Sequence, residues 1–317
     1  MTKAITQVKT IKIIDLFAGI GGIRLGFERA YHGKIESVFS SEWNKYSVQT
    51  YQANFGMEKV HGDITKIDEN DVPYHDILLA GFPCQPFSQA GLKKGFDDIR
   101  GTLFFDIARI LKAKQPPAFL LENVKQLRGH DKGKTLEVIM NTLKDIGYKN
   151  VQYQLLKARD FGLPQNRERL YIVGFLNDDV KFEFPKPLNI ETCVGDVLEK
   201  NVDPKYTISD KLWAGHQRRK KENKAKGKGF GYSLFTTESA YTSTISARYY
   251  KDGSEIFIAQ EGKNPRKVTP KEAARLQGFP EDFKIPVSDT QAYQQFGNSV
   301  PVKVIEAIAK EMLKHLS

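Results

Sequence analysis

Short apolar runs alternate with amphipathic stretches through the first half of the chain. The apolar runs cover residues 11–17, 37–40, 76–80, 118–121 and 170–175. Between them, the spacing typical of helices is found at residues 44–55, 102–113 and 135–146. Strands separated by helices of this length predict βαβ units and a mostly parallel sheet, and hence an α/β fold. Ligands of such sheets bind at the carboxyl ends of the strands.

The pattern changes after residue 187. Residues 188–265 are richer in Gly, Lys, Tyr and Thr, and only 241–247 and 255–259 have the character of short strands. We interpret this stretch as a second, smaller and irregular domain.

Helical spacing returns near the end of the chain. It is found at residues 269–276, where Thr269 and Glu272 have the spacing of a capping box, and again at 302–316. One face of the last helix is apolar and consists of Val304, Ile305, Ile308, Ala309 and Met312.

The bulk composition is that of an ordinary soluble globular protein, and its few cysteines fit a reducing cytoplasm. The 317 residues are 40% hydrophobic and 27% charged. The cysteines are Cys84 and Cys193 alone, which excludes a disulfide scaffold and a cysteine-rich zinc site, and no metal is expected. Residues 1–10 have no apolar core and no run approaches the ~20 apolar residues of a membrane span, so we expect a cytoplasmic protein.

Positive charge is concentrated in one window. The net charge is +10, and residues 211–230 contribute eight basic side chains against one acid, Glu222. Such a window either binds a polyanion or forms a solvated, mobile loop.

A glycine-rich turn follows the first predicted strand. Residues 15–22 read Asp-Leu-Phe-Ala-Gly-Ile-Gly-Gly and open a helix, a combination that brings backbone close to an anionic ligand but occurs in many nucleotide binders. After the next strand, Glu42 can bind ribose hydroxyls and Trp43 can stack on adenine. The alternative is a surface acid beside a packed indole. Asp63 is a weaker candidate for holding an exocyclic amine.

A cysteine follows the apolar run 76–80. Residues 83–88 read Pro-Cys-Gln-Pro-Phe-Ser, so prolines fix the backbone around Cys84 at the end of a buried strand. This favours a presented thiolate, whereas the alternative is an inert loop thiol.

Two further strand ends carry charge. Glu122 directly follows the run 118–121, at the predicted end of a buried strand. Burial there favours a protonated carboxyl that can act as a general acid; alternatively, Glu122 caps the next segment. Arg167 and Arg169 lie on the same side of an extended segment and can orient carboxylates or phosphates, or they are ordinary surface charges.

Together these residues resemble the DNA (cytosine-5) methyltransferases, and in particular the Dcm-type and restriction-modification enzymes of bacteria. The resemblance rests on residues 15–22, 81–88, 122–124, 165–169, 275–280 and 293–300, which occur in the family's order and spacing. It implies a Rossmann-like methyltransferase fold with a mixed sheet and a smaller, irregular, β-rich target-recognition domain. It also implies S-adenosylmethionine as methyl donor, S-adenosylhomocysteine as product and a flipped-out cytosine of double-stranded DNA as acceptor.

The resemblance also implies a domain division and residue roles. Residues 1–187 would form the catalytic domain, 188–265 the target-recognition domain, 266–290 a hinge and 291–317 a helix that returns to the catalytic domain. Cys84 would add to C6 of cytosine, Glu122 would neutralise charge at N3, and Arg169, with Arg167 nearby, would hold O2 and the carboxylate. The base that removes the C5 proton is not identified.

The resemblance also implies which residues bind the methyl donor and the DNA. The donor site would comprise Phe17, Gly19, Ile20, Gly21, Glu42, Trp43, Asp63, Ile64, Pro83, Leu103, Asn298 and Ser299. Residues 88–100 would close over the target, with glycines that either act as hinges or only form turns. The expected DNA contacts are Ser88, Gln89, Arg100, Lys228, Phe230, Tyr232, Thr244, Arg248, Tyr249 and Lys251. The recognition region resembles that of enzymes acting on CCGG, CCWGG or CCNGG, which predicts the inner cytosine as target.

Three alternatives are set against this interpretation. A related fold methylates cytosine in tRNA, but its distinct recognition segment is not found. A catalytically silent DNA-binding relative would lack Cys84, Glu122 or the glycine turn, and all are present. A nucleotide-dependent oxidoreductase would leave the cysteine segment and the basic window unused. We expect a monomer associated with the nucleoid through DNA binding. A separately encoded restriction endonuclease is the expected partner for such an enzyme, but an orphan methyltransferase would have the same sequence features.

Overall fold

The computed structural model describes residues 9–83, 103–229 and 231–316. The expected functional residues Cys84, Ser88, Gln89, Arg100 and Phe230 lie outside this range. The chain divides into two compact units. The first unit contains Met1–Leu156, Glu168–Lys186 and Val304–Ser317, and the second contains Lys157–Arg167 and Pro187–Lys303.

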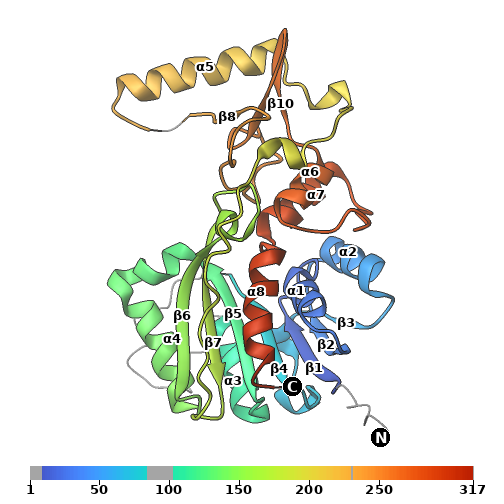
Figure 1. The fold of residues 1–317 in the computed structure, drawn as a ribbon, viewed down its shortest axis with the longest axis vertical. Helices are drawn as coiled ribbons and strands as arrows, with labels where there is room; N and C mark the ends of the chain where they lie inside the picture. Colours follow the sequence, from blue (N-terminus) through green and yellow to red (C-terminus); the bar gives the residue numbers. More distant parts are fainter. Residues whose placement is uncertain (1–8, 84–102, 230, 317) are drawn as a thin grey trace, which may run out of the picture. The chain divides into compact units, whose positions relative to one another are not determined.

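A seven-stranded mixed sheet forms the centre of the first unit (Figure 1). Its order is β3-β2-β1-β4-β5-β7-β6, and the strands from β3 to β5 pair in parallel. The next strand, β7, is antiparallel to β5. The bounds are β1 Ile11–Leu16, β2 Ile35–Ser41, β3 Val60–His61, β4 Ile77–Gly81, β5 Ala118–Val124, β6 Asn150–Lys157 and β7 Glu168–Phe175. The predicted α/β fold with a mixed sheet is confirmed.

Helices complete the first unit. Their bounds are α1 Gly22–Ala30, α2 Lys45–Phe55, α3 Leu103–Lys114, α4 Lys134–Asp145 and α8 Val302–Leu313, which belongs to this unit from Val304 onward. Shorter 3₁₀ segments lie at η1 Ile64–Lys66, η2 Glu69–Asp71 and η5 Lys125–Gly133. The predicted helices at 44–55, 102–113 and 135–146 therefore agree with α2, α3 and α4 to within one residue at each end.

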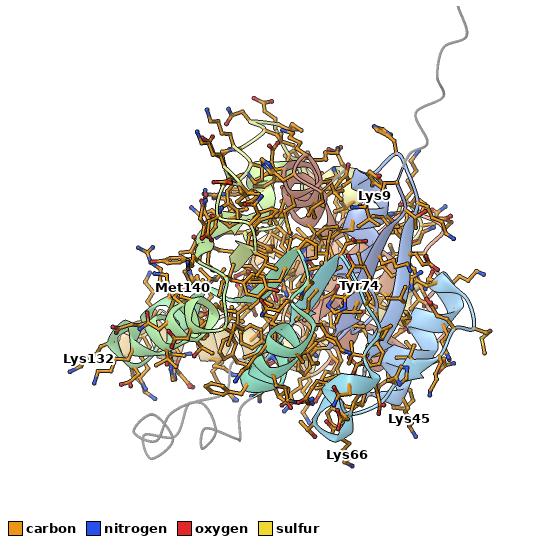
Figure 2. All side chains as sticks on the ribbon, turned by 90° about the horizontal axis from the view of Figure 1, so that it is seen from below. Lys9, Lys45, Lys66, Tyr74, Lys132 and Met140 are labelled. Atoms are coloured by element: carbon orange, nitrogen blue, oxygen red, sulfur yellow. The ribbon has the colours of Figure 1, made fainter. Side chains whose placement is uncertain are left out.

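Side chains fill both faces of the sheet, as strands in parallel sheets require. Ile14, Leu78 and Phe119 belong to one core cluster with residues of α3 and α4. Ile13 and Leu79 are adjacent to these residues in their strands, so their side chains point to the other face of the sheet, and they are also fully buried. Figure 2 shows this filled interior from below, with charged side chains such as those labelled Lys45, Lys66 and Lys132 at the periphery.

The last helix packs into the first unit against α1. A methyl group built at Gly26 would lie 2.4 Å from Cγ2 of Ile305, so the two helices approach closely only because position 26 has no side chain. The Nε atom of Arg29 lies 3.3 Å from a carboxylate oxygen of Glu306. The predicted apolar face of α8 is confirmed, since all of its residues are fully buried: Val304, Ile305, Ile308, Ala309 and Met312.

The second unit has little regular structure. Its three-stranded sheet has the order β10-β9-β8, with β8 Leu234–Phe235, β9 Phe257–Gln260 and β10 Lys263–Lys267. Its helices are α5 Asp210–Ala225, α6 Pro270–Leu276 and α7 Asp289–Asn298, and its 3₁₀ segments are η6 Ala158–Phe161, η7 Val194–Val197 and η8 Pro204–Tyr206. Residues 266–303 fall in this unit together with 188–265, while the division into recognition domain and hinge remains a prediction.

The capping box of α6 is present as predicted. The Oγ1 atom of Thr269 accepts a hydrogen bond from the Glu272 backbone N–H at 3.1 Å, and the Glu272 carboxylate accepts one from the Thr269 N–H at 2.9 Å. The same carboxylate pairs with both terminal nitrogens of Arg266 at 2.7 and 2.8 Å. Because Glu272 is fully buried, this bidentate pair satisfies a charge that would otherwise be costly.

The structure adds to or differs from the sequence-based interpretation in three places. Residues 241–247 form no strand and have only an isolated bridge between Thr242 and Gln165. Most of the basic window is the 16-residue helix α5 rather than a loop. Strand β6 was not predicted, because its outward residues leave no apolar run to recognise.

We expect Gly26→Ala to lower the free energy of unfolding by roughly 1 kcal/mol or more, because overpacking against Ile305 outweighs the gain in helix propensity. Thermal unfolding followed by circular dichroism measures the change. Gly215→Ala in α5 is the matched control, because a methyl group there meets no atom within 4 Å and should be neutral or stabilising by up to about 1 kcal/mol. Equal midpoints for the two variants would contradict the described contact.

Candidate active site

An ion pair lies at the carboxyl edge of the sheet. The Nε atom of Arg169 is 3.1 Å from Oε1 of Glu122, and both side chains are largely buried. Glu122 is near the end of β5, and Arg169 is the second residue of β7 and pairs in register with Val124. Because β7 is antiparallel to β5, its beginning lies beside the end of β5, and residues two positions apart in register share a face. The sheet itself therefore brings the two charges together.

Gly81 lies directly beside the Glu122 carboxylate. Gly81 pairs with Glu122 in the parallel ladder between β4 and β5. A methyl group at position 81 would lie 3.5 Å from Oε2 of Glu122, in ordinary contact, so a larger side chain would compete for this region. The Glu122 carboxylate therefore lies between Arg169, which pairs with it, and Gly81, which ends β4.

The chain that leads to Cys84 is fixed next to this carboxylate. Asn123 donates a hydrogen bond through Nδ2 to the Phe82 carbonyl at 2.9 Å, and both residues are buried. Pro83 follows and is exposed. Cys84 comes directly after Pro83 and lies outside the described residues, so its nucleophilic role remains a prediction.

Three loops that carry predicted donor-site residues follow adjacent strands. Gly19, Glu42 and Asp63 come after β1, β2 and β3, which are neighbours in the sheet (Figure 1). The Ser41 hydroxyl donates to the Gly62 carbonyl at 2.7 Å, which links the second loop to the third. Since the strands are parallel, these loops meet at one edge of the sheet.

The glycine turn has the strained backbone that its sequence suggests. Phe17, Gly19 and Gly21 have φ angles of 55°, 55° and 81°, in the left-handed region. At Gly21 a methyl group would lie only 2.2 Å from the ring of Phe55, so both the backbone angle and the space require glycine. Ile20 is buried within the turn.

Glu42 ties this turn to the loop after β2. Its Oε2 accepts from the Gly19 N–H at 2.9 Å and its Oε1 accepts from the Asn44 N–H at 2.7 Å. Burial raises the pKa of Glu42, and the backbone donors act against that rise. The adjacent Trp43 is 78% exposed, so its indole is not packed in the interior and offers a free ring face.

Asp15 is a buried acid that was not predicted as a site residue. It lies in β1 just before the glycine turn, and its Oδ2 has no hydrogen-bond partner within the described part of the chain. Burial raises its pKa to about 7, while the positive charge of Arg24 acts in the opposite direction. In the sequence, its position in a largely apolar strand and at the start of the motif 15–22 was the only signal of this residue.

The remaining donor-site candidates of the first unit have mixed environments. Asp63 is exposed and caps η1, because its Oδ1 accepts from the Thr65 N–H at 3.1 Å and from the Thr65 hydroxyl at 2.8 Å. These hydrogen bonds lower the pKa of Asp63 and favour the carboxylate. Ile64 is buried, and Leu103 is the first residue of α3.

Arg167 has a structural role inside the second unit. Its side chain is 1% exposed and donates to the backbone carbonyls of Ile245 at 3.1 Å, Gly297 at 3.0 Å and Ser299. The expectation that Arg167 acts beside Arg169 relied on one extended segment, but β7 begins only at Glu168. Arg167 instead fixes the backbone on both sides of Asn298, where two predicted donor-site residues lie.

The predicted DNA-contacting residues of the second unit differ in accessibility. Lys228, Arg248 and Lys251 are exposed. The Thr244 hydroxyl donates to the Asn166 carbonyl at 2.7 Å. Tyr232 is half-buried and its ring contacts Trp213 at a centroid distance of 4.6 Å.

Tyr249 does not present its hydroxyl to DNA in this structure. It is fully buried, donates to the Ile256 carbonyl at 2.6 Å and accepts from the Val268 N–H at 2.9 Å. Since both hydrogen bonds lie within the unit, we leave Tyr249 out of the proposed DNA contacts.

We expect Arg167→Met to lower the free energy of unfolding by about 3 kcal/mol or more, because three backbone carbonyls lose their donor. Urea unfolding followed by intrinsic fluorescence measures this. The exposed Arg248→Met is the control, with an expected change within about 0.5 kcal/mol. A similar small change for Arg167→Met would show that the three carbonyls do not depend on it.

The chain is similar to known proteins over almost its entire length. It is 72% identical over 306 residues to the type II methyltransferase M.NlaX of Neisseria lactamica, across 96% of this chain and 97% of that protein. It is 66% identical over 309 residues to M1.ScrFI of Lactococcus lactis subsp. cremoris, across 96% and 78% respectively. The solved structure of the S. pombe Dnmt2 methyltransferase shares the fold, with a TM-score of 0.79 at 20% identity, across 98% of this chain and 100% of that chain.

A family model matches residues from both compact units. The model of the C-5 cytosine-specific DNA methylases covers residues 11–314, which include the glycine turn, the Glu122 and Arg169 pair and the Asn298 segment. The chain therefore belongs to the C-5 cytosine-specific DNA methylase family, whose members transfer a methyl group from S-adenosylmethionine to C5 of cytosine in DNA.

Proposed function

We propose that this DNA (cytosine-5) methyltransferase is a type II enzyme that methylates the inner cytosine of a short duplex palindrome beginning with CC and ending with GG. The observation that carries the catalytic part of the proposal is the ion pair between Glu122 and Arg169, beside the strand that leads to Cys84. Relatives at 72% and 66% identity are named type II methyltransferases, which supports the enzyme class.

Cytosine C5 must be activated before it can accept a methyl group. In the proposed reaction the Cys84 thiolate forms a bond to C6, and the electrons of the C5–C6 double bond become available at C5. The C5 atom then takes the methyl carbon, the bond from methyl to sulfonium breaks, and S-adenosylhomocysteine leaves. A base removes the C5 proton, the double bond forms again, and the thiolate is expelled.

Glu122 and Arg169 serve the addition step in this proposal. Addition at C6 places negative charge on N3, and a carboxyl group that donates a proton there lowers the energy of the adduct. Arg169 holds Glu122 at 3.1 Å and has further guanidinium donors that can bind the O2 atom of the base. The partial burial of both side chains strengthens these interactions, because water competes less for them.

The groups at the edge of β1, β2 and β3 suit S-adenosylmethionine. Glu42 is anchored by two backbone donors and has acceptor capacity left for ribose hydroxyls, and the exposed Trp43 can stack on adenine. The glycine turn lets the backbone approach the methionine part of the donor. When bound, the donor supplies an electrophilic methyl group. These assignments, like those of Asn298 and Ser299, are part of the proposal.

The acceptor base must leave the duplex. A cytosine inside the helix cannot reach a nucleophile at the sheet edge, so we propose that the target is flipped out, at a cost of roughly a few kcal/mol. The segment 88–100, proposed to close over it, lies outside the described residues. The exposed Arg248 and Lys251 of the second unit are proposed to contact the DNA around the target.

The location and partners of the enzyme follow from this proposal. No helix in the described part of the chain is long and apolar enough to cross a membrane. We propose that the protein acts as a monomer on the DNA of a bacterial cytoplasm. A separately encoded restriction endonuclease that reads the same sequence is its proposed partner, and methylation would protect the host DNA from that enzyme.

A covalent trap tests the nucleophile. We expect the protein, with S-adenosylmethionine and a duplex that carries 5-fluorocytosine at the target, to form a stable adduct, because fluorine cannot leave C5 as a proton does. Denaturing electrophoresis detects the adduct, and peptide mapping should place it at Cys84. The Cys84→Ala variant should form none.

The matched control is Cys193→Ala, since Cys193 lies in the second unit and donates from Sγ to the Thr237 carbonyl at 2.8 Å. It should retain the adduct, whereas Glu122→Gln should slow adduct formation at least 100-fold. An adduct that persists in Cys84→Ala would overturn the proposed nucleophile.

Bisulfite sequencing tests the target sequence. Plasmid DNA incubated with the enzyme and donor should resist conversion at the second cytosine of sites that begin with CC and end with GG. The same plasmid incubated with Cys84→Ala should convert fully. Modified cytosines without a preceding C would refute the proposed sequence and leave the methyltransferase activity itself intact.

A further inference from the structure

Helix α5 presents an unusual density of positive charge. It spans Asp210–Ala225, begins at the N-cap Ser209 and is 16 residues long, which corresponds to about 24 Å. Figure 1 shows it as an extended helix of the second unit. Its basic side chains and the two that follow it are all exposed: Lys211, Arg218, Arg219, Lys220, Lys221, Lys224, Lys226 and Lys228.

One side of α5 is fixed to the small sheet by aromatic contacts. The His216 ring is buried and lies 5.1 Å from the ring of Phe257 in β9. The Trp213 ring contacts Tyr232 at 4.6 Å and Phe257 at 6.3 Å. Lys220 adds a cation–π contact of 4.1 Å to Tyr232. The helix is therefore attached to the unit by packing as well as by its chain ends.

The opposite side of α5 carries an excess of positive charge. At 100° per residue, Lys211, Arg218 and Lys221 point away from His216, and the short side chains of Ala214 and Ala225 lie on the same side. Asp210, at the start of the helix, and Glu222 are the acidic residues there, and Glu222 lies 3.7 Å from Arg218. Within the described residues, Lys221 and the flanking Lys224 form no ion pair. The result is a row of cations on a rigid support.

The chemistry of this row fits a polyanion better than a protein partner. Apolar and aromatic residues of α5, such as Leu212 and Trp213, belong to the packed side, so the outer side offers no apolar anchor. Alanines between the cations let an extended surface approach closely. Lysine and arginine at these spacings can reach successive phosphates of a nucleic acid backbone.

We propose that α5 binds backbone phosphates of the DNA duplex outside the recognition sequence. This inference rests on the proposed action on duplex DNA. A recognition site of four or five base pairs extends for about 17 Å, which is less than the length of α5, and phosphate contacts carry no sequence information. The helix thus adds affinity for DNA that flanks the site and places no demand on the flanking sequence.

Binding to two duplexes tests this inference. Both contain the same target site, one with three and one with twelve base pairs on each side, and Kd is measured by fluorescence anisotropy from 50 to 200 mM salt. The full-length triple variant Arg218→Gln, Lys221→Gln, Lys224→Gln should lose roughly 10-fold or more in affinity for the long duplex at low salt. Its slope of log K against log salt should fall by about 2 to 3, because three phosphate contacts are removed.

The triple variant should bind the short duplex nearly as well as the wild type. It should also keep its kcat for methyl transfer at saturating long duplex, since α5 takes no part in the chemistry. Its thermal midpoint should be unchanged, because all three side chains are exposed.

A second triple variant removes the same charge elsewhere. Lys34, Lys144 and Lys181 are exposed residues of the first unit. Lys34 precedes β2 and Lys181 follows β7, at the sheet edge opposite the candidate active site. Changing all three to Gln should leave both affinities and the salt slope close to those of the wild type.

Two outcomes separate this inference from the proposed function. Equal loss of affinity in both triple variants, or no dependence on flank length in the wild type, would overturn the role of α5 while methyl transfer continued. A wild-type enzyme that transferred no methyl group to either duplex would refute the proposed function and the inference together.

Discussion

The antiparallel pairing of β7 with β5 is the constraint on which the candidate site depends. A parallel strand would begin at the amino edge of the sheet, and Arg169 would then be far from Glu122. Because β7 runs in the opposite direction, its first residues lie at the carboxyl edge, beside the ends of β4 and β5. The ion pair and the end of β4 that leads toward Cys84 come together there.

Much of the first unit could be predicted, because its strands are buried on both faces and appear as plain apolar runs. Strand β6 was missed because its outward side chains are polar or exposed. Helix α5 was missed for a related reason: among its residues only His216 is buried, so no apolar stripe marks its face. The capping box at Thr269 was recognisable because both of its partners are local in sequence.

The prediction of site residues from the sequence was limited in the same way. The motifs predicted Glu122 and Arg169 together, and the sheet register explains why they meet. The predicted extended segment also placed Arg167 on the same side as Arg169. In the structure, however, Arg167 is buried and donates to backbone carbonyls of residues distant in sequence, and a local sequence pattern cannot predict such contacts. Tyr249 and Asp15 are similar cases, since each side chain's burial depends on the tertiary structure.

The contact between Gly26 and Ile305 has a consequence for the order in which the molecule can form. The chain passes between the two units at residues 156, 167, 186 and 303, so α8 is made after the strands and the other helices of the first unit. During synthesis, the side of α1 that contacts Ile305 has no covering helix until α8 emerges. The nascent first unit would then depend on chaperones or on transient contacts to protect that face from aggregation.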